Sequence, residues 1–237
     1  MEKKTNTLEL HPKPAPQYKI AVPTHREIGW GTVKNLVADL LKRDMFPLAG
    51  IWRQCGADVS RNEAICPDQR CFPELPPVAG VLCLDTDIVA TVDQVLALEK
   101  KFSERSLDVL AGLYRKREDD AYCVSIYGDK SETKKLSGII PVRQVGFGCA
   151  FIRTSLLAKI PKPWFHTEWT TVKNSKREEE WRLIPEDTIF CQKVIAVGGK
   201  VWCDFDVEVG HKTLGADALK AYSQALLDEV RPPENKT

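Results

Sequence analysis

The chain has 237 residues, of which 43% are hydrophobic, so it is long enough to bury one large α/β core or two small ones. Its 34 basic and 33 acidic residues leave a net charge of +1, which argues against a protein that holds nucleic acid by general electrostatic attraction. No stretch approaches the roughly 20 apolar residues of a membrane span, and no apolar signal core is present, so we expect a cytoplasmic protein.

Polar, proline-containing tails flank the part of the chain that is expected to fold. Residues 1–17 and 231–237 show no apolar period, so both are predicted to be flexible. No linker or internal repeat interrupts residues 18–230, which predicts one domain. None of the eight cysteines stands in a Cys-x-x-Cys pair, so we expect small buried side chains rather than a zinc ribbon.

The first predicted elements are a strand and a helix. Tyr18–Val22 is a short apolar strand ended by Pro23, and apolar residues return at helical spacing over 33–41. Residues 48–80 show no clear period. They predict a loop-rich segment, which contains Arg61.

Two carboxylates follow the next predicted strand. The apolar run Val81–Leu84 predicts a buried strand, and Asp85 and Asp87 come directly after it. Because side chains alternate faces along a strand, both carboxylates can point the same way. Two like charges this close repel unless a cation lies between them, and a divalent metal is the usual cation. At the carboxyl end of a strand, such a metal favours a phosphate ligand.

The second half of the chain alternates strands and helices. A helix begins after Thr91, with Gln94 in the capping-box position, and another begins at Pro185 and ends at Gly198. This alternation predicts an α/β sheet with a ligand at the carboxyl ends of its strands. The further strands are expected at 107–113, 122–127, 149–152 and 201–205, and a final helix at 219–230.

Three groups of polar residues have both a structural and a functional explanation. Glu186 and Asp187 stand in the first turn of a predicted helix, where they stabilise the helix dipole or provide a general base. His211 follows a glycine and is either a packed histidine or a metal ligand. Arg61 is suited to a phosphate, and equally to a surface carboxylate.

Several short motifs occur in an order that is more specific than any one of them. The motifs are Pro23-Thr24 after a strand, Arg61-Asn62, Leu84–Asp87, Gly146–Arg153, Pro185–Cys191 and Val209–His211. With these motifs in this order, the chain resembles the GT-A glycosyltransferases, especially the family-two-like enzymes that use nucleotide sugars, over residues 18–213. The resemblance implies an α/β fold: a single Rossmann-like GT-A domain with a mixed, mostly parallel central sheet flanked by helices.

The resemblance also implies roles for individual residues. Asp187, with Glu186 beside it, matches the pair whose aspartate is the usual catalytic base. Asp85 and Asp87 match the Asp-x-Asp motif that binds Mn²⁺ or Mg²⁺, and His211 matches a histidine that completes the coordination in some members. The positions implied for the nucleotide-sugar donor are Pro23, Thr24, Arg26, Arg61, Asp85, Asp87, Gly146, Phe147 and Gly148.

The acceptor is less defined than the donor. The resemblance implies transfer to a hydroxyl on a glycan, a small molecule or a hydroxylated base in DNA, with inversion or retention at the sugar. Residues 161–184 are expected to form a long, partly mobile loop that contacts the acceptor. Their interleaved basic and aromatic side chains are typical of a nucleic-acid contact, although a solvated loop with a few packed aromatics explains them better.

Two other functions stay open at this point. A nucleotidyltransferase acting on sugar phosphates uses a related sheet, but its usual glycine-rich first loop is absent from residues 23–26. A non-catalytic protein that binds sugar nucleotides is the other alternative. The set of three aspartates and one histidine described above argues against that second alternative.

Overall fold

The computed structural model describes residues 17–24, 33–46, 48–53, 57–65, 78–116, 121–127, 135–173 and 177–211, with the backbone alone for Thr24, 48–53 and 57–60. Both predicted tails (Gln17 apart), the first loop with Arg26, and the final helix expected at 219–230 lie outside these residues. No helix of the described residues is long and apolar enough to cross a membrane.

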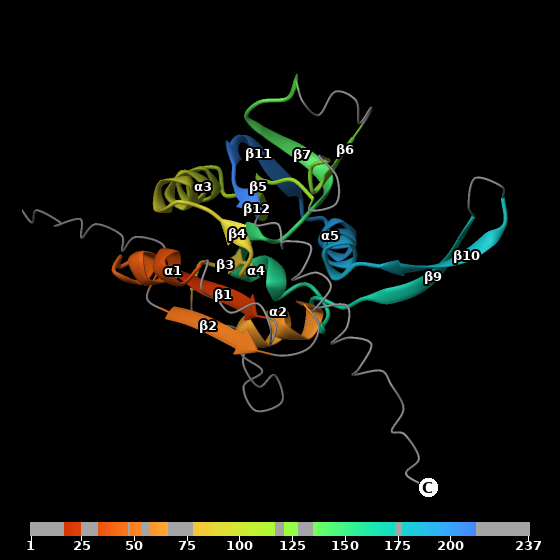
Figure 1. Cartoon of the computed structure of the whole chain (residues 1–237), viewed down its shortest axis with the longest axis horizontal. Coiled ribbons are helices and arrows are strands. Elements are labelled where there is room, and N and C mark those ends of the chain that lie inside the picture. The colour runs from red at the N-terminus through yellow and green to blue at the C-terminus, as the bar shows by residue number, and fades with distance from the viewer. Residues whose placement is uncertain are drawn as a thin grey trace, which may run out of the picture.

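Eight of the described strands form a central sheet, in the order β2-β1-β3-β8-β5-β11-β7-β6 (Figure 1). Parallel pairing joins β2, β1 and β3, and also β5 and β11, whereas β8 and β7 pair antiparallel with their neighbours. Six strands therefore share one direction, which confirms the mixed, mostly parallel sheet. The strands are β1 Tyr18–Thr24, β2 Leu48–Arg53, β3 Gly80–Leu84, β5 Val109–Leu113, β6 Val124–Ile126, β7 Ile139–Val145, β8 Cys149–Arg153 and β11 Val201–Glu208.

Helices cover both faces of this sheet. One buried cluster joins the sheet to α1 and α3, and a second joins it to α2, α4 and α5. In β3, Val81 and Cys83 belong to one cluster and Leu82 and Leu84 to the other, so this central strand is buried on both faces. The helices are α1 Lys34–Leu41, α2 Ala57–Ile65, α3 Val92–Glu104, α4 Thr154–Leu157 and α5 Glu186–Ala196.

The ends of the two longest described helices follow the sequence predictions. Thr91 caps α3: its hydroxyl accepts a hydrogen bond from the Gln94 backbone at 3.2 Å, and the Gln94 side chain accepts one from the Thr91 backbone at 2.8 Å. Pro185 precedes α5, and Gly198 adopts a φ of 80° just beyond its end. Glu186 and Asp187 therefore occupy the first turn of α5, as predicted.

The prediction that β1 ends at Pro23 was wrong, because β1 continues to Thr24. The pairing of β1 with β3 stops at Ala21, whereas its pairing with β2 continues to Thr24. Beyond Ala21 the strand therefore has a neighbour on one side only. Proline, which lacks an N–H donor, is tolerated at such a strand edge.

The prediction of a loop-rich segment over 48–80 was also wrong in part, because β2 and α2 lie within it. The side of α2 that faces the protein includes two buried polar residues, Arg61 and Asn62, beside Ala64 and Ile65. A helix that buries polar side chains lacks the apolar period by which helices are recognised.

Residues 161–173 and 177–184 form ordered structure rather than the long loop that was predicted. Trp164 and Phe165 are buried, and beyond them β9 (Glu168–Lys173) and β10 (Glu179–Ile184) pair as an antiparallel hairpin. We call this hairpin the arm. It extends away from the sheet beyond α5 (Figure 1), so neither strand shows the alternation of a strand packed on a core.

Asn62 attaches the start of the arm to α2. Its side-chain amide donates to the Phe165 carbonyl at 2.6 Å, and its side-chain oxygen accepts from the Phe165 N–H at 3.1 Å. The Phe165 ring stacks on Phe190 of α5 with 4.3 Å between centroids. Asn62 thus links α2 to α5 through Phe165, whose peptide groups bind Asn62 and whose ring stacks on Phe190.

We predict that Asn62→Ala lowers the free energy of unfolding by about 1–3 kcal/mol, because it leaves buried polar groups of Phe165 unpaired. Urea denaturation followed by circular dichroism measures this change. Asn62→Asp keeps the acceptor for the Phe165 N–H but places a buried carboxylate against the Phe165 carbonyl, so its loss at pH 7 should be at least as large. An Asn62→Ala protein as stable as the unmodified chain would contradict the proposed link.

Candidate active site

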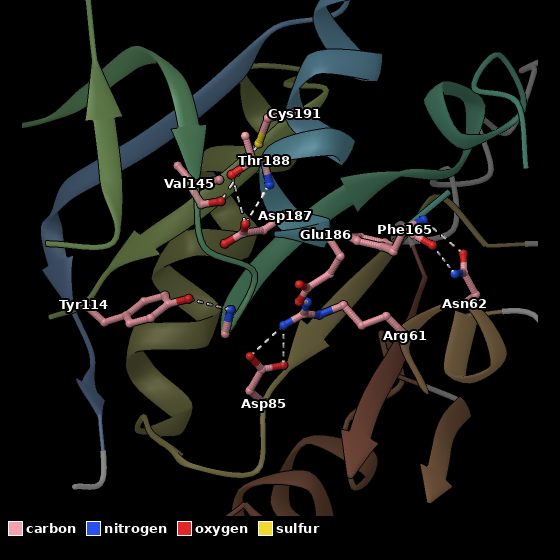
Figure 2. Close-up of polar contacts among 11 residues, drawn as sticks. Arg61, Asn62, Asp85, Tyr114, Val145, Phe165, Glu186, Asp187, Thr188 and Cys191 are labelled. Atoms are coloured by element: carbon pink, nitrogen blue, oxygen red, sulfur yellow. Dashed lines mark hydrogen bonds and ion pairs between the residues drawn. The ribbon is translucent and has the colours of Figure 1, made fainter. Parts of the chain in front are cut away.

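Three elements that are distant in the sequence meet at the carboxyl end of β3. Asp85 follows the last residue of β3, Arg61 comes from α2, and Glu186 and Asp187 begin α5 (Figure 2). The carboxyl end of the central parallel strands is where α/β sheets bind their ligands. The predicted site residues of these three elements are therefore brought together.

Arg61 lies between two carboxylates at the centre of the site. It is only 4% exposed, and its Nη2 lies 2.9 Å and 2.7 Å from the two oxygens of Asp85. Its Nη1 donates to Glu186 (Figure 2). Burial alone lowers the pKa of Arg61, but the two carboxylates outweigh this effect and raise it. The guanidinium therefore stays charged and holds both carboxylates.

Asp85 is held by Arg61 and does not join Asp87 and His211 in one ligand set. Burial raises the pKa of Asp85, Arg61 opposes this rise, and Glu186 and Asp187 add to it. Among the described residues, no three His, Cys, Asp or Glu side chains are grouped so as to hold a metal ion. The predicted set of Asp85, Asp87 and His211 is thus divided between an ion pair and a separate carboxylate–imidazole pair.

Asp87 and His211 form that second pair. A two-residue strand β4 (Ile88–Val89) pairs with β12 (Gly210–His211) and brings His211 to Asp87, with 3.4 Å between Nε2 and Oδ2. The His211 Nδ1 lies 2.8 Å from the Arg115 carbonyl, which can only accept, so Nδ1 carries the proton. Nε2 then faces the Asp87 carboxylate either as a protonated cation or as a lone-pair donor.

This pair fits a divalent cation. A backbone carbonyl that fixes the proton on one ring nitrogen and directs the other to the ligand is the usual arrangement of a metal-binding histidine. One carboxylate and one imidazole suit Mn²⁺, and Mg²⁺ and its relatives commonly take one or two carboxylates and complete their coordination with phosphate and water. Asp87 and His211 are therefore the residues that would hold such an ion.

Asp187 differs from Glu186 in its surroundings. Glu186 is bound by Arg61, whereas Asp187 Oδ1 accepts hydrogen bonds from the Thr188 N–H at 2.6 Å and its hydroxyl at 3.3 Å (Figure 2). Burial raises the pKa of Asp187, and the nearby charge of Glu186 raises it further. A carboxylate with a raised pKa binds a proton more strongly, which suits it to act as a general base.

The glycine segment 146–148 lies against Tyr114, a residue that the sequence analysis did not select. The Gly148 N–H donates to the Tyr114 hydroxyl at 3.2 Å, and the Gly148 carbonyl accepts from the Asp85 N–H at 2.9 Å. A Cβ at Gly146 would lie 1.9 Å from the Tyr114 oxygen, so only glycine fits there. The tyrosine and the two glycines thus position the backbone of Asp85.

Phe147 does not line an open site. It is completely buried and packs edge-on against Phe165 and Phe190, with centroids 5.3 Å and 4.9 Å away. Its ring supports α5 from the core, so a donor sugar would meet the backbone of this segment rather than the ring. Its place in the fold therefore differs from the predicted lining role.

The first predicted loop is described only at its start. Pro23 is buried in β1, where this strand pairs with β2, and Thr24 ends the strand. Arg26 lies outside the described residues. The assignment of these three residues to the nucleotide therefore stays a prediction.

Comparison with known proteins shows the fold. Neither a protein-family model nor a curated protein matches the chain. The solved structure of A197 from STIV matches with a TM-score of 0.53 and 20% identity, over 82% of this chain and 85% of that chain. TarS from S. aureus matches with a TM-score of 0.45 and 13% identity, over 90% of this chain and 39% of TarS. The likeness to A197 covers most of both chains and confirms a single Rossmann-like α/β fold.

We predict that Arg61→Met lowers the free energy of unfolding by up to about 3–5 kcal/mol, because it leaves two partly buried carboxylates without a compensating charge. Urea denaturation at pH 7 measures the loss. Arg61→Met combined with Glu186→Gln should lose less, since one of the two charges is removed. Arg182→Ala, which removes an exposed arginine paired with Glu180, is the matched control and should change stability by less than about 1 kcal/mol. Equal losses in the single and double variants would contradict the charge argument.

We predict that Asp187→Asn raises the melting temperature at pH 8 and that this gain shrinks as the pH falls through the folded-state pKa toward 3.8. The pKa of Asp187 is raised in the folded protein above its usual value of 3.8, so the fold disfavours the ionised carboxylate. That penalty is fully present above the folded-state pKa and disappears as the pH falls below the unfolded value. Melting curves at several pH values measure the gain. A gain that grows at acid pH would contradict the raised pKa.

Proposed function

We propose that the chain is a glycosyltransferase that moves a sugar from a nucleotide-diphosphate sugar to an acceptor hydroxyl. The observation that carries the proposal is the arrangement at the carboxyl end of β3. There Asp85 binds the buried Arg61, which also binds Glu186 beside Asp187, and two residues after Asp85 the carboxylate of Asp87 pairs with His211. The motif order along the chain supports it, and so does the fold that the chain shares with A197.

Asp87 and His211 would bind a divalent cation, which in turn would bind the diphosphate of the donor. When bound, Mn²⁺ or Mg²⁺ supplies the positive charge that neutralises the departing nucleoside diphosphate. The carbonyl of Arg115 keeps the His211 ring in the orientation that this binding requires. Asp85 contributes by holding Arg61, whose positive charge lies in the same end of the sheet.

Asp187 would activate the acceptor. The acceptor oxygen forms a bond to the anomeric carbon of the sugar, and the bond from that carbon to the donor phosphate oxygen breaks. The electron pair of the broken bond leaves with the nucleoside diphosphate, and the hydroxyl proton passes to the Asp187 carboxylate. Glu186 is less suited to accept this proton, because its carboxylate is already bound by Arg61.

We further propose that Arg61 acts as a positioning residue in place of direct donor contact. Its guanidinium is buried and occupied by Asp85 and Glu186, so it acts through the two carboxylates that it orients. This positioning role differs from the donor contact that the family resemblance implies for Arg61. The residue still lies in the part of the site where the resemblance implies it.

We predict that uridine or guanosine diphosphate with Mn²⁺ raises the melting temperature by about 5–10 °C at a hundredfold excess over the Kd, which corresponds to about 2.7 kcal/mol of added stability. Differential scanning fluorimetry measures the shift. Asp87→Ala and His211→Ala should abolish it, and a chelator should remove it in the unmodified chain.

Asp39→Ala is the matched control, because Asp39 is an exposed aspartate on α1 that forms a salt bridge with Lys42. It should keep the full shift. Hydrolysis of a panel of nucleotide sugars then separates an enzyme from a binding protein. A nucleotide-induced shift without any donor hydrolysis would support the non-catalytic alternative, and no shift with any nucleoside diphosphate would contradict the proposal.

A further inference from the structure

One face of the arm is exposed along its whole length. In the register of β9 and β10, Trp169 lies opposite Leu183, Thr171 opposite Trp181, and Lys173 opposite Glu179. Residues that lie opposite each other in a hairpin share a face, as do residues two apart on a strand. We call these six residues the outer face, and all six side chains are exposed.

The outer face carries two unusually exposed aromatic rings. Trp169 is 62% exposed and Trp181 is 70% exposed, and Leu183 beside them is 43% exposed. On the opposite face of the arm, Thr170, Val172, Glu180 and Ile184 are all partly covered. Large aromatic rings are rarely left on a surface without a partner, and two-stranded hairpins are only marginally stable on their own. The outer face is therefore suited to bind something.

The outer face continues into the candidate active site. Leu183 is three residues before Glu186, and β10 passes through Ile184 and Pro185 directly into the first turn of α5. The arm leaves the body of the protein at this point and extends outward from α5 (Figure 1). One end of the outer face therefore lies four residues before Asp187 in the chain.

The charge of the arm excludes a polyanion as the occupant. Residues 168–184 contain four acidic side chains, at 168, 178, 179 and 180, and four basic ones, at 173, 176, 177 and 182. Their sum is zero. A surface that binds nucleic acid or an anionic membrane needs an excess of positive charge. The arm therefore does not favour the nucleic-acid acceptor that its basic and aromatic residues first suggested.

A second copy of the chain fits the outer face less well than a sugar does. The face alternates apolar rings with Thr171, Lys173 and Glu179, whereas the cores of stable protein interfaces are depleted of charged residues. A pyranose ring has apolar C–H groups on its faces and hydroxyls around its rim. The electron-rich face of a tryptophan attracts those C–H groups, and the polar residues between the rings can bind the hydroxyls.

We propose that the outer face binds a neutral saccharide chain, which is the acceptor of the transfer reaction. The inference rests on the proposed function, since only a transferase requires an acceptor hydroxyl close to Asp187. Trp169 and Trp181 hold successive parts of the saccharide on the outer face. The terminal sugar then extends past Leu183 toward the first turn of α5.

The experiment is a titration of the full chain with a panel of neutral oligosaccharides: hexaoses of glucose in α and β linkage, xylose, mannose and N-acetylglucosamine. Isothermal calorimetry and tryptophan fluorescence measure the Kd. We expect at least one of these to bind, with a Kd about tenfold weaker in Trp169→Ala and in Trp181→Ala. Trp181→Phe, which keeps an aromatic ring, should retain most of the affinity.

The matched control is Tyr127→Ala, which removes an aromatic side chain that is 53% exposed and follows β6 rather than lying on the arm. It should bind the saccharide as the unmodified chain does. No binding to any member of the panel up to about 10 mM would overturn the inference. A tryptophan variant that changes the molar mass of the protein in light scattering would also overturn the inference. The same holds for a tryptophan variant that abolishes binding to a single-stranded 20-nucleotide DNA or to phosphatidylcholine–phosphatidylglycerol vesicles.

Failure of this inference can be told from failure of the proposed function. Trp169→Ala and Trp181→Ala should leave hydrolysis of the nucleotide sugar unchanged while transfer to the saccharide falls about tenfold. Donor hydrolysis without saccharide binding would overturn the acceptor site alone. Saccharide binding without any nucleotide shift would overturn the transferase.

Discussion

The ion pairs of Arg61 with Asp85 and Glu186 determine how the site is built. Asp85 lies at the end of a central strand, Glu186 begins a helix about one hundred residues later in the chain, and Arg61 comes from a helix before both. Two carboxylates and one guanidinium, removed from water, are stable only when they stay together. This requirement holds the start of α5 against the end of β3, and with it the position of Asp187.

The ion pair with Arg61 also gives Asp85 and Asp87 different partners. Asp85 and Asp87 look equivalent in the sequence, and both suggest a metal ligand. Once Arg61 has bound Asp85 through both oxygens, the other carboxylate meets the imidazole of His211 instead. The carbonyl of Arg115 fixes the tautomer of that imidazole, so the chemistry of the pair depends on a backbone group that no motif reveals.

The sequence predicted those elements whose local pattern agrees with their surroundings. The strand before Asp85 is apolar because it is buried on both faces, and α3 and α5 have recognisable caps, so all three were expected close to where they lie. The helix α2 and the arm were missed for opposite reasons. The helix buries Arg61 and Asn62 where a helix normally buries apolar residues, whereas the arm exposes Trp169, Trp181 and Leu183 where a strand normally exposes polar ones.

The helix α2 and the arm, which show these two departures, are connected by hydrogen bonds and an ion pair. Asn62 of α2 binds the peptide groups of Phe165 just before the arm, and the arm returns to the protein at Glu186, which Arg61 binds. A buried polar pair on one element and an exposed aromatic pair on the next both lower the stability that each element would have by itself. Sequences retain such departures where a site needs them. Asn62 and Arg61 of α2 thus hold the chain just before and just after the arm, at Phe165 and at Glu186.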